Sequence, residues 1–133
     1  EMDKLLLNNE YKSLPISILP PSSNINLIYG CFDFLLMPSR FEGLPLVVLE
    51  AFASELPVIA SNAPGLNEAI PKNWELLFKN KNTKELAKII ENIILNNYDI
   101  QSLKEEGLNF VKNNFNLKNT IKKKKKIYLQ EEL

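Results

Sequence analysis

The chain has 133 residues, of which 45% are hydrophobic and 24% charged, a composition typical of one modest globular domain. Its 16 basic and 16 acidic residues give no net charge, which removes a bulk electrostatic argument for binding nucleic acid. The absence of histidine excludes Ser-His and Cys-His catalysis and removes the commonest zinc ligand.

Cys31 is the single cysteine, so no internal disulfide can form, and a reducing, cytoplasmic compartment fits best. Because no histidine can activate it, we expect Cys31 to be a small buried apolar residue rather than a nucleophile. No apolar stretch reaches the ~18 residues that a membrane span needs, and no signal peptide opens the chain. The sequence starts with EMDKLLL rather than with Met, so we expect a fragment or a processed chain.

Short apolar runs alternate with helical patterns from the start of the chain. Residues 15–19 (PISIL) predict a strand, and Asn24 is expected to cap a short helix over residues 25–31. Residues 33–38 (DFLLMP) form a continuous apolar run closed by proline, which is typical of a strand buried on both faces. The next segment, residues 45–55, predicts a helix with proline in its first turn.

The pattern continues with a second buried strand over residues 56–61, a short helix over 64–70 and a fourth strand over 75–78. Trp74, before the last of these, is interpreted as a partly exposed packing residue rather than a stacking platform. Strands that alternate with helices predict an α/β fold with a Rossmann-like parallel sheet and flanking helices.

The remaining sequence is helical. Asn82 and Glu85 form a capping box before a helix whose apolar residues recur at helical spacing, namely Leu86, Ile89, Ile90, Ile93 and Ile94. Two further helical segments are expected over about 100–113 and 117–132, and the lysines at 122–126 are interpreted as a solvated helix face, with contact to an anionic membrane surface as the alternative. Because no linker divides the chain, residues 1–133 are treated as one domain.

The loop over residues 39–45 (SRFEGLP) lies between a predicted strand and a predicted helix. Ligands of parallel sheets bind where strands end and helices begin. Free amides and the helix dipole favour an anion there, and Gly43 lets a ligand approach the backbone closely. We therefore expect a phosphate at the amides around Gly43 and Leu44, with Arg40 either a loop cation or a further phosphate contact.

Two carboxylates, Glu42 and Glu50, border this anion site. Since like charges repel, Glu42 cannot bind the phosphate, but a carboxylate accepts hydrogen bonds from hydroxyls and suits a vicinal diol. A nucleotide sugar offers a diphosphate between sugar hydroxyls and ribose hydroxyls, and so satisfies both groups. The structural alternatives are that Glu42 is only an acid favoured near a helix N-terminus and that Glu50 is only a solvated helix residue.

The E-x7-E spacing, its internal Gly-Leu-Pro and the following LEAFASELPVIASNAPGLNE resemble the donor-site core of retaining GT-B glycosyltransferases of family 4, also called glycosyl transferases group 1. The resemblance runs from about Ile25 to Phe115 and implies the second half of a GT-B C-terminal domain. It implies that Glu42 contacts the donor sugar in a catalytic role and that Glu50 contacts ribose. Gly43, Leu44 and Pro45 then contact sugar and phosphate, and no metal or cofactor is implied.

Several features depart from the family pattern. Pro64-Gly65 stands where members often carry Gly-Gly, and Glu68 is retained. Gly65 and Glu68 are therefore further site candidates, with a turn glycine and a first-turn acid as the structural alternatives. The small residue usual before Leu-Pro is Glu55 here. The family's phosphate-binding Arg and Lys and its acceptor-binding N-terminal domain have no counterpart, so we expect the chain to lack part of the donor site.

The resemblance implies transfer of a sugar, with retention, from a nucleotide-diphosphate sugar to an acceptor sugar or lipid-linked glycan. Polysaccharide, glycolipid or lipopolysaccharide biosynthesis is the expected setting, in the cytoplasm or peripherally at the inner membrane face. The PPSSN stretch (residues 20–24) is a candidate contact for the base, and the isolated chain is expected to be inactive. The alternatives are a donor-binding module of a split transferase, completed by a second chain, and a non-catalytic remnant.

Overall fold

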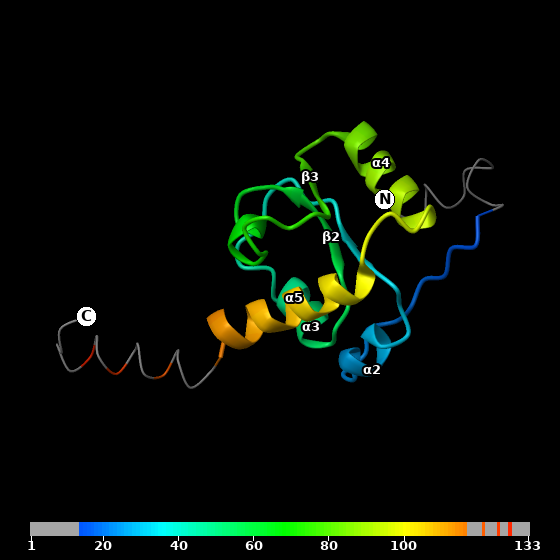
Figure 1. Cartoon of the computed structure of the whole chain (residues 1–133). Coiled ribbons are helices and arrows are strands. Elements are labelled where there is room, and N and C mark those ends of the chain that lie inside the picture. Colours follow the sequence, from blue (N-terminus) through cyan, green and yellow to red (C-terminus); the bar gives the residue numbers. More distant parts are fainter. Residues whose placement is uncertain (1–13, 117–120, 122–124, 126–127, 129–133) are drawn as a thin grey trace.

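The computed structural model describes residues 14–116 together with residues 121, 125 and 128 (Figure 1). The elements follow in the order α2 (Ile25–Tyr29), β1 (Leu35–Met37), α3 (Leu46–Ala53), β2 (Val58–Asn62), η1 (Leu66–Glu68), β3 (Leu77–Lys79), α4 (Thr83–Ile94) and α5 (Ile100–Asn114). The strands form a parallel sheet in the order β1-β2-β3. The predicted α/β fold with flanking and C-terminal helices is confirmed.

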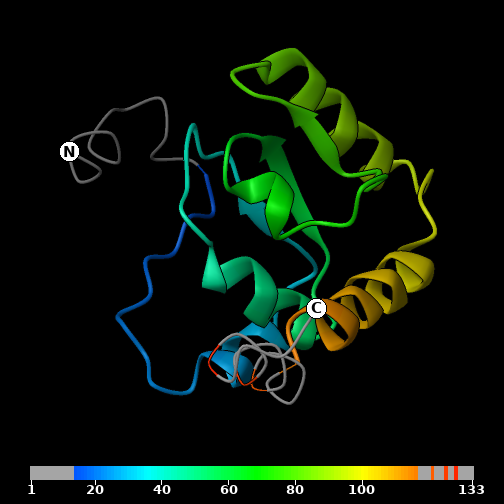
Figure 2. The same cartoon turned by 90° about the vertical axis from the view of Figure 1, so that its left-hand side faces the viewer.

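Helices cover both sides of this sheet. Figures 1 and 2 show α4 on one side and α3 with α5 on the other. The close contact of α3 with α5 depends on Gly107, because a side-chain carbon at that position would run into the ring of Phe52. No helix in the described part of the chain is both long and apolar enough to span a bilayer.

The core is centred on α3 and β2. Phe52 is buried and packs edge-on against Trp74, with ring centroids 5.0 Å apart. The indole Nε1 of Trp74 donates a hydrogen bond of 2.6 Å to the carbonyl of Val58. Trp74 is therefore a packing residue, as predicted, but it is buried rather than partly exposed, because a buried acceptor satisfies its N–H.

The two apolar strands predicted to be central have different surroundings. In β2, Val58 to Ser61 are buried, as predicted for a central strand. In β1, however, Leu36 is 43% exposed and its two neighbours are half-buried, so the prediction of a strand buried on both faces was wrong. The physical reason is that β1 lies at the edge of the sheet, where no described strand covers its outer side.

Other expectations need correction in the segment before β1. Residues 15–19 are exposed and form no strand, since no described strand pairs with them. Asn24 does precede α2, but its side chain makes no capping hydrogen bond. Cys31 is exposed rather than buried, because it lies in the turn that follows α2.

The helices after β3 agree with the sequence pattern. The side-chain oxygen of Asn82 accepts a hydrogen bond from the Glu85 amide at 3.2 Å, as in a capping box. The Glu85 carboxylate in turn accepts a hydrogen bond of 2.7 Å from the amide of Lys79, so it bonds to the end of β3. Ile89 faces the core. The helix expected over residues 117–132, with its lysine run, falls outside the described residues apart from three isolated positions.

Candidate functional site

The loop over residues 38–45 leaves the carboxyl end of β1 and leads into α3. Three contacts from other parts of the sheet hold it. The hydroxyl of Ser61 donates to the carbonyl of Ser39, the Asn80 side chain donates to the carbonyl of Arg40 at 3.0 Å, and the Glu42 amide donates to the carbonyl of Pro64 at 3.0 Å. The loop backbone is thus fixed by the end of β2 and by the segments that follow β2 and β3.

Glu42 is held by a local hydrogen bond. The hydroxyl of Ser39 donates to its Oε1 at 2.6 Å, and within the described residues its Oε2 has no partner. The residue lies three positions before Pro45, the N-cap of α3, and its carboxylate does not bond to the helix amides. The reading of Glu42 as a simple helix-capping acid therefore has no contact to support it, and one carboxylate oxygen remains available to a ligand.

The backbone next to Glu42 offers hydrogen-bond donors. The amides of Gly43 and Leu44 form no hydrogen bond within the described part of the chain. Helix α3 begins after Pro45 without a side-chain cap and without an acid in its first turn. Pro45 occupies the N-cap rather than the first turn and is buried. Free amides and the positive end of a helix meet at this point, which is a favourable place for an anion.

Gly65 lies directly against the backbone of the loop at Glu42 and Gly43. Its φ angle is +85°, a conformation that favours glycine. A side-chain carbon there would collide with the carbonyl oxygens of Glu42 and Gly43, so only glycine allows the loop to lie this close. Gly65 is therefore more than a turn residue, because it sets the position of the two loop residues. Glu68 lies exposed in the single turn of η1 and makes no hydrogen bond within the described residues.

Glu50 projects from α3 and contacts Tyr29 of α2. The hydroxyl of Tyr29 donates to Glu50 Oε2 at 3.5 Å, while the carboxylate itself is exposed. Burial raises the pKa of Tyr29 above its ordinary value of 10.0, and the charge of Glu50 and the hydrogen bond it accepts raise that pKa further. Tyr29 therefore stays protonated as a donor that orients Glu50.

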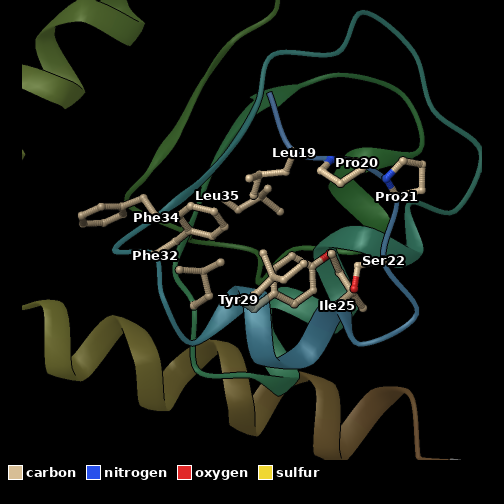
Figure 3. Close-up of a pocket in the computed structure, with 11 residues that line it drawn as sticks. Leu19, Pro20, Pro21, Ser22, Ile25, Tyr29, Phe32, Phe34 and Leu35 are labelled. Carbon is tan, nitrogen blue, oxygen red and sulfur yellow. The ribbon is translucent and has the colours of Figure 1, made fainter. Parts of the chain in front are cut away.

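Arg40 and the PPSSN stretch line two separate pockets. Arg40 is exposed and lines a pocket of about 220 Å³ with Lys81 and Thr83. Pro20, Pro21 and Ser22 of the PPSSN stretch line a pocket of about 400 Å³ that also includes Tyr29 (Figure 3). The structure thus links this stretch to Glu50 through Tyr29.

Sequence reasoning missed four residues that hold the site: Tyr29, Ser39, Ser61 and Asn80. Ser39 could have been found, because Ser-x-x-Glu is a recognised local hydrogen-bonding pattern. The other three act across 21 to 40 positions of sequence, and no local pattern marks such pairs.

Comparison with known proteins agrees with this arrangement. Residues 4–96 match the family described as Glycosyl transferases group 1. An uncharacterized glycosyltransferase of Haemophilus influenzae is 32% identical over 100 residues, which cover 71% of this chain and 28% of that protein. The sulfoquinovosyl transferase SQD2 of Arabidopsis thaliana is 49% identical over 47 residues, covering 35% of this chain and 9% of the relative.

A third relative, the D-inositol 3-phosphate glycosyltransferase of Rhodococcus jostii, is 34% identical over 83 residues, covering 59% of this chain and 18% of that protein. The chain thus spans less than a third of the length of these relatives. The family match covers most of the chain and includes the loop, the helix α3 and both glutamates. The chain belongs to the glycosyl transferases group 1 family, glycosyltransferase family 4.

Proposed function

We propose that the chain is the donor-binding part of a retaining glycosyltransferase that moves a sugar from a nucleotide-diphosphate sugar to an acceptor hydroxyl. The observation that carries this proposal is the pairing of a Ser39-held carboxylate on Glu42 with the free amides of Gly43 and Leu44. A carboxylate that accepts from hydroxyls and amides that donate to phosphate are the two groups that a sugar diphosphate needs side by side.

The amides of Gly43 and Leu44 donate hydrogen bonds to the diphosphate. Its negative charge grows as the sugar leaves, and preorganised donors stabilise that charge by roughly 3 kcal/mol each when they are well placed. The uncapped start of α3 adds the positive end of the helix dipole. Glu42 accepts hydrogen bonds from the donor sugar and holds it over the diphosphate, which is its catalytic role in this proposal.

Glu50 serves the other end of the donor. It accepts from the ribose hydroxyls, and the Tyr29 hydroxyl keeps its carboxylate in place. Pro20, Pro21 and Ser22 of the PPSSN stretch line one pocket with Tyr29, which supports contact of this stretch with the base. Arg40 and Glu68 have no assigned contact in this scheme, while Gly65 positions the loop.

The acceptor is proposed only by class. The R. jostii relative is named for D-inositol 3-phosphate. A relative of Campylobacter jejuni, 37% identical over 70 residues, is named as an N-acetylgalactosaminyltransferase of N,N'-diacetylbacillosaminyl-diphospho-undecaprenol, so the two names point to chemically different acceptors. We propose an acceptor sugar or lipid-linked glycan, with the enzyme in the cytoplasm or at the inner membrane face. The chain on its own is expected to be inactive in transfer.

Calorimetry with paired ligands tests the donor site. UDP-, GDP- and ADP-sugars are screened first by thermal shift, and the best ligand is then compared with its free nucleoside diphosphate. Glu50→Ala should weaken both ligands by roughly 1.5–3 kcal/mol, the value of a hydrogen bond to a charged group. Glu42→Ala should weaken only the nucleotide sugar, because the free diphosphate lacks the sugar that Glu42 holds.

The matched control is Glu91→Ala, which removes an exposed carboxylate from α4. It should leave both affinities unchanged. Equal losses for both ligands in the Glu42 and Glu50 variants would show that the two carboxylates have structural roles and would overturn this assignment. If the wild-type chain binds no nucleotide sugar, the proposal fails as a whole.

A further inference from the structure

A pocket of about 220 Å³ lies between the site loop and the start of α4. Arg40 of the loop and Lys81, which follows β3, both line it. Phe78 and Leu86 supply apolar parts of the wall, and Phe78 is buried in the core. Two cations from segments that are far apart in sequence therefore meet at one pocket with a firm apolar wall.

Neither cation has a counter-ion in the described part of the chain. The side chains of Arg40 and Lys81 form no ion pair and no hydrogen bond with the residues that the structure describes. The acid at the start of α4, Glu85, does not line the pocket. The Glu85 carboxylate accepts hydrogen bonds from the amide of Lys79 and from the side chain of Asn82 instead. The positive charge of the pocket is thus left for a ligand.

The backbone is fixed at both cations. The side chain of Asn80 donates to the carbonyl of Arg40 at 3.0 Å, which ties the loop to the segment after β3. The amide of Asn82 donates to the carbonyl of Lys79 at 2.9 Å and closes a turn in which Lys81 has a φ angle of +66°. Glycine and asparagine adopt this conformation more readily than lysine. The chain thus carries a charged side chain where its backbone conformation does not favour one.

A phosphate group is the ligand that suits this pocket. The guanidinium of arginine presents paired N–H donors that match phosphate oxygens, and the lysine ammonium adds a second positive charge. A phosphate monoester carries up to two negative charges near neutral pH, so it matches two cations better than a carboxylate does. The pocket has several times the ~30 Å³ that a water molecule occupies in the liquid, and its apolar wall suits the carbon part of a ligand.

The pocket is separate from the proposed position of the donor diphosphate. The free amides of Gly43 and Leu44 lie at the start of α3, whereas the pocket lies at the start of α4. These two helices cover opposite sides of the sheet (Figures 1 and 2). Arg40 precedes Glu42 by two residues, a span of at most ~7 Å along the backbone. A ligand in the pocket is therefore close to the sugar that Glu42 is proposed to hold.

We propose that Arg40 and Lys81 bind a phosphate group of the acceptor, at a position separate from the donor diphosphate. The anion site itself rests on the pocket and its two unpaired cations. Its assignment to the acceptor rests on the proposed function, since a transferase must hold its second substrate beside the donor sugar. The acceptor is then a phosphorylated sugar or a lipid-linked diphosphate, which share this phosphate chemistry.

NMR spectra of the amide groups of the full 133-residue chain test the site. The probes are inorganic phosphate, glucose 6-phosphate and farnesyl diphosphate, each added in the presence of saturating nucleoside diphosphate. The probes should shift the amide signals of Lys81 and Thr83, whereas glucose and farnesol, which lack phosphate, should not. Tighter binding of glucose 6-phosphate than of inorganic phosphate supports a sugar phosphate as the acceptor, and tighter binding of farnesyl diphosphate supports a lipid-linked one.

Two variants remove the charges one at a time. Arg40→Gln and Lys81→Asn should each weaken binding of the probes at least about fivefold at low salt, because each removes a charge-assisted hydrogen bond. Asparagine tolerates a positive φ angle, so Lys81→Asn should keep the fold, which circular dichroism checks. The matched control is Lys88→Gln, which removes an exposed charge from α4 outside the pocket and should leave binding unchanged.

Three results overturn the proposal. The first is that no probe shifts the signals of Lys81 and Thr83. The second is that Lys88→Gln weakens binding as much as the pocket variants do, which would show general attraction to positive surface. The third is that nucleoside diphosphate raises the apparent Kd of phosphate in proportion to its own concentration, since separate sites give a limiting value instead. If phosphate binds at Lys81 but no nucleoside diphosphate binds the chain, the donor function and the assignment to an acceptor fail while the anion site stands.

Discussion

Two neighbouring strands that both carry an apolar run, β1 and β2, are surrounded very differently. Leu36 and Ile59 are partners in the parallel register, yet Leu36 is 43% exposed and Ile59 only 5%. Neither strand alternates apolar with polar residues. An apolar run therefore indicates that a strand is suited to burial on both faces. Whether the strand is in fact buried depends on the other strands and helices that pack around it.

The difference extends to the segments on either side. The core around β2 includes Phe52 of α3, Leu103 of α5 and Trp74 of the segment before β3. Beyond β1 lie residues 14–20, all exposed. We call residues 14–37 the open half and the remainder of the described chain the closed half. The site loop leaves β1 in the open half but is fixed by Ser61, Gly65 and Asn80 of the closed half.

The register partners give the largest expected effect. Ile59→Ala removes buried side-chain volume and should lower the free energy of unfolding by about 2–5 kcal/mol. Leu36→Ala should cost about 1 kcal/mol or less, because the side chain already contacts water. Urea unfolding followed by circular dichroism measures both. Equal losses in the free energy of unfolding would mean that Leu36 is as well buried as Ile59, which would contradict the difference between the two strands.

Substitutions of Gly65 and Gly43 test whether the closed half supports the loop. Gly65→Ala places a side chain at φ +85° and against two loop carbonyls, so it should cost roughly 1–3 kcal/mol and weaken donor binding. Gly43→Ala has no atom within 4 Å of the added carbon and should change stability by no more than about 0.5 kcal/mol. Thermal unfolding and calorimetry check both. A fully stable Gly65→Ala protein that binds donor normally would show that the closed half does not support the loop.

Local sequence patterns predicted much of this fold. The helix α4 follows from its apolar spacing and from the cap at Asn82, which bonds to a helix amide. The helix α5 lies where a helical segment was expected, and its cap at Asp99 is a finding of the structure. The strand β2 follows from its apolar run. The exposure of β1 and of residues 15–19 could not be predicted in the same way, because strand burial depends on partners that are distant in sequence or outside the described residues.

The candidate site likewise combines residues that local sequence identifies with contacts that only the fold creates. Glu42, Gly43 and Glu50 stand close together in sequence, so their spacing and the loop between strand and helix were enough to single them out. The contact of Gly65 with the loop and the bond from Tyr29 to Glu50 join segments about 20 residues apart. Such contacts arise only when the sheet forms, and no local spacing reveals them.

Tyr29 provides the smallest expected effect, since it is the buried residue of the open half that contacts the site. Its pKa is raised in the folded chain, so the folded state holds the phenolic proton to higher pH than the unfolded state does. This contribution to stability is fully present below the unfolded value of about 10 and is lost as pH rises from there through the folded pKa. Near neutral pH, Tyr29→Phe should therefore cost no more than about 1 kcal/mol, the value of one hydrogen bond.

The pH dependence separates this role from simple packing. Above about pH 10 the wild-type free energy of unfolding should fall more steeply than that of Tyr29→Phe, by up to about 1.4 kcal/mol per pH unit, because only the wild type releases this proton on unfolding. Urea unfolding of both proteins between about pH 8 and pH 11 measures the difference, and lysine titration cancels because both share it. If the free energies of unfolding of the two proteins changed with pH in parallel, folding would not raise the Tyr29 pKa. The hydrogen bond from Tyr29 would then be too weak to orient Glu50 toward a ribose.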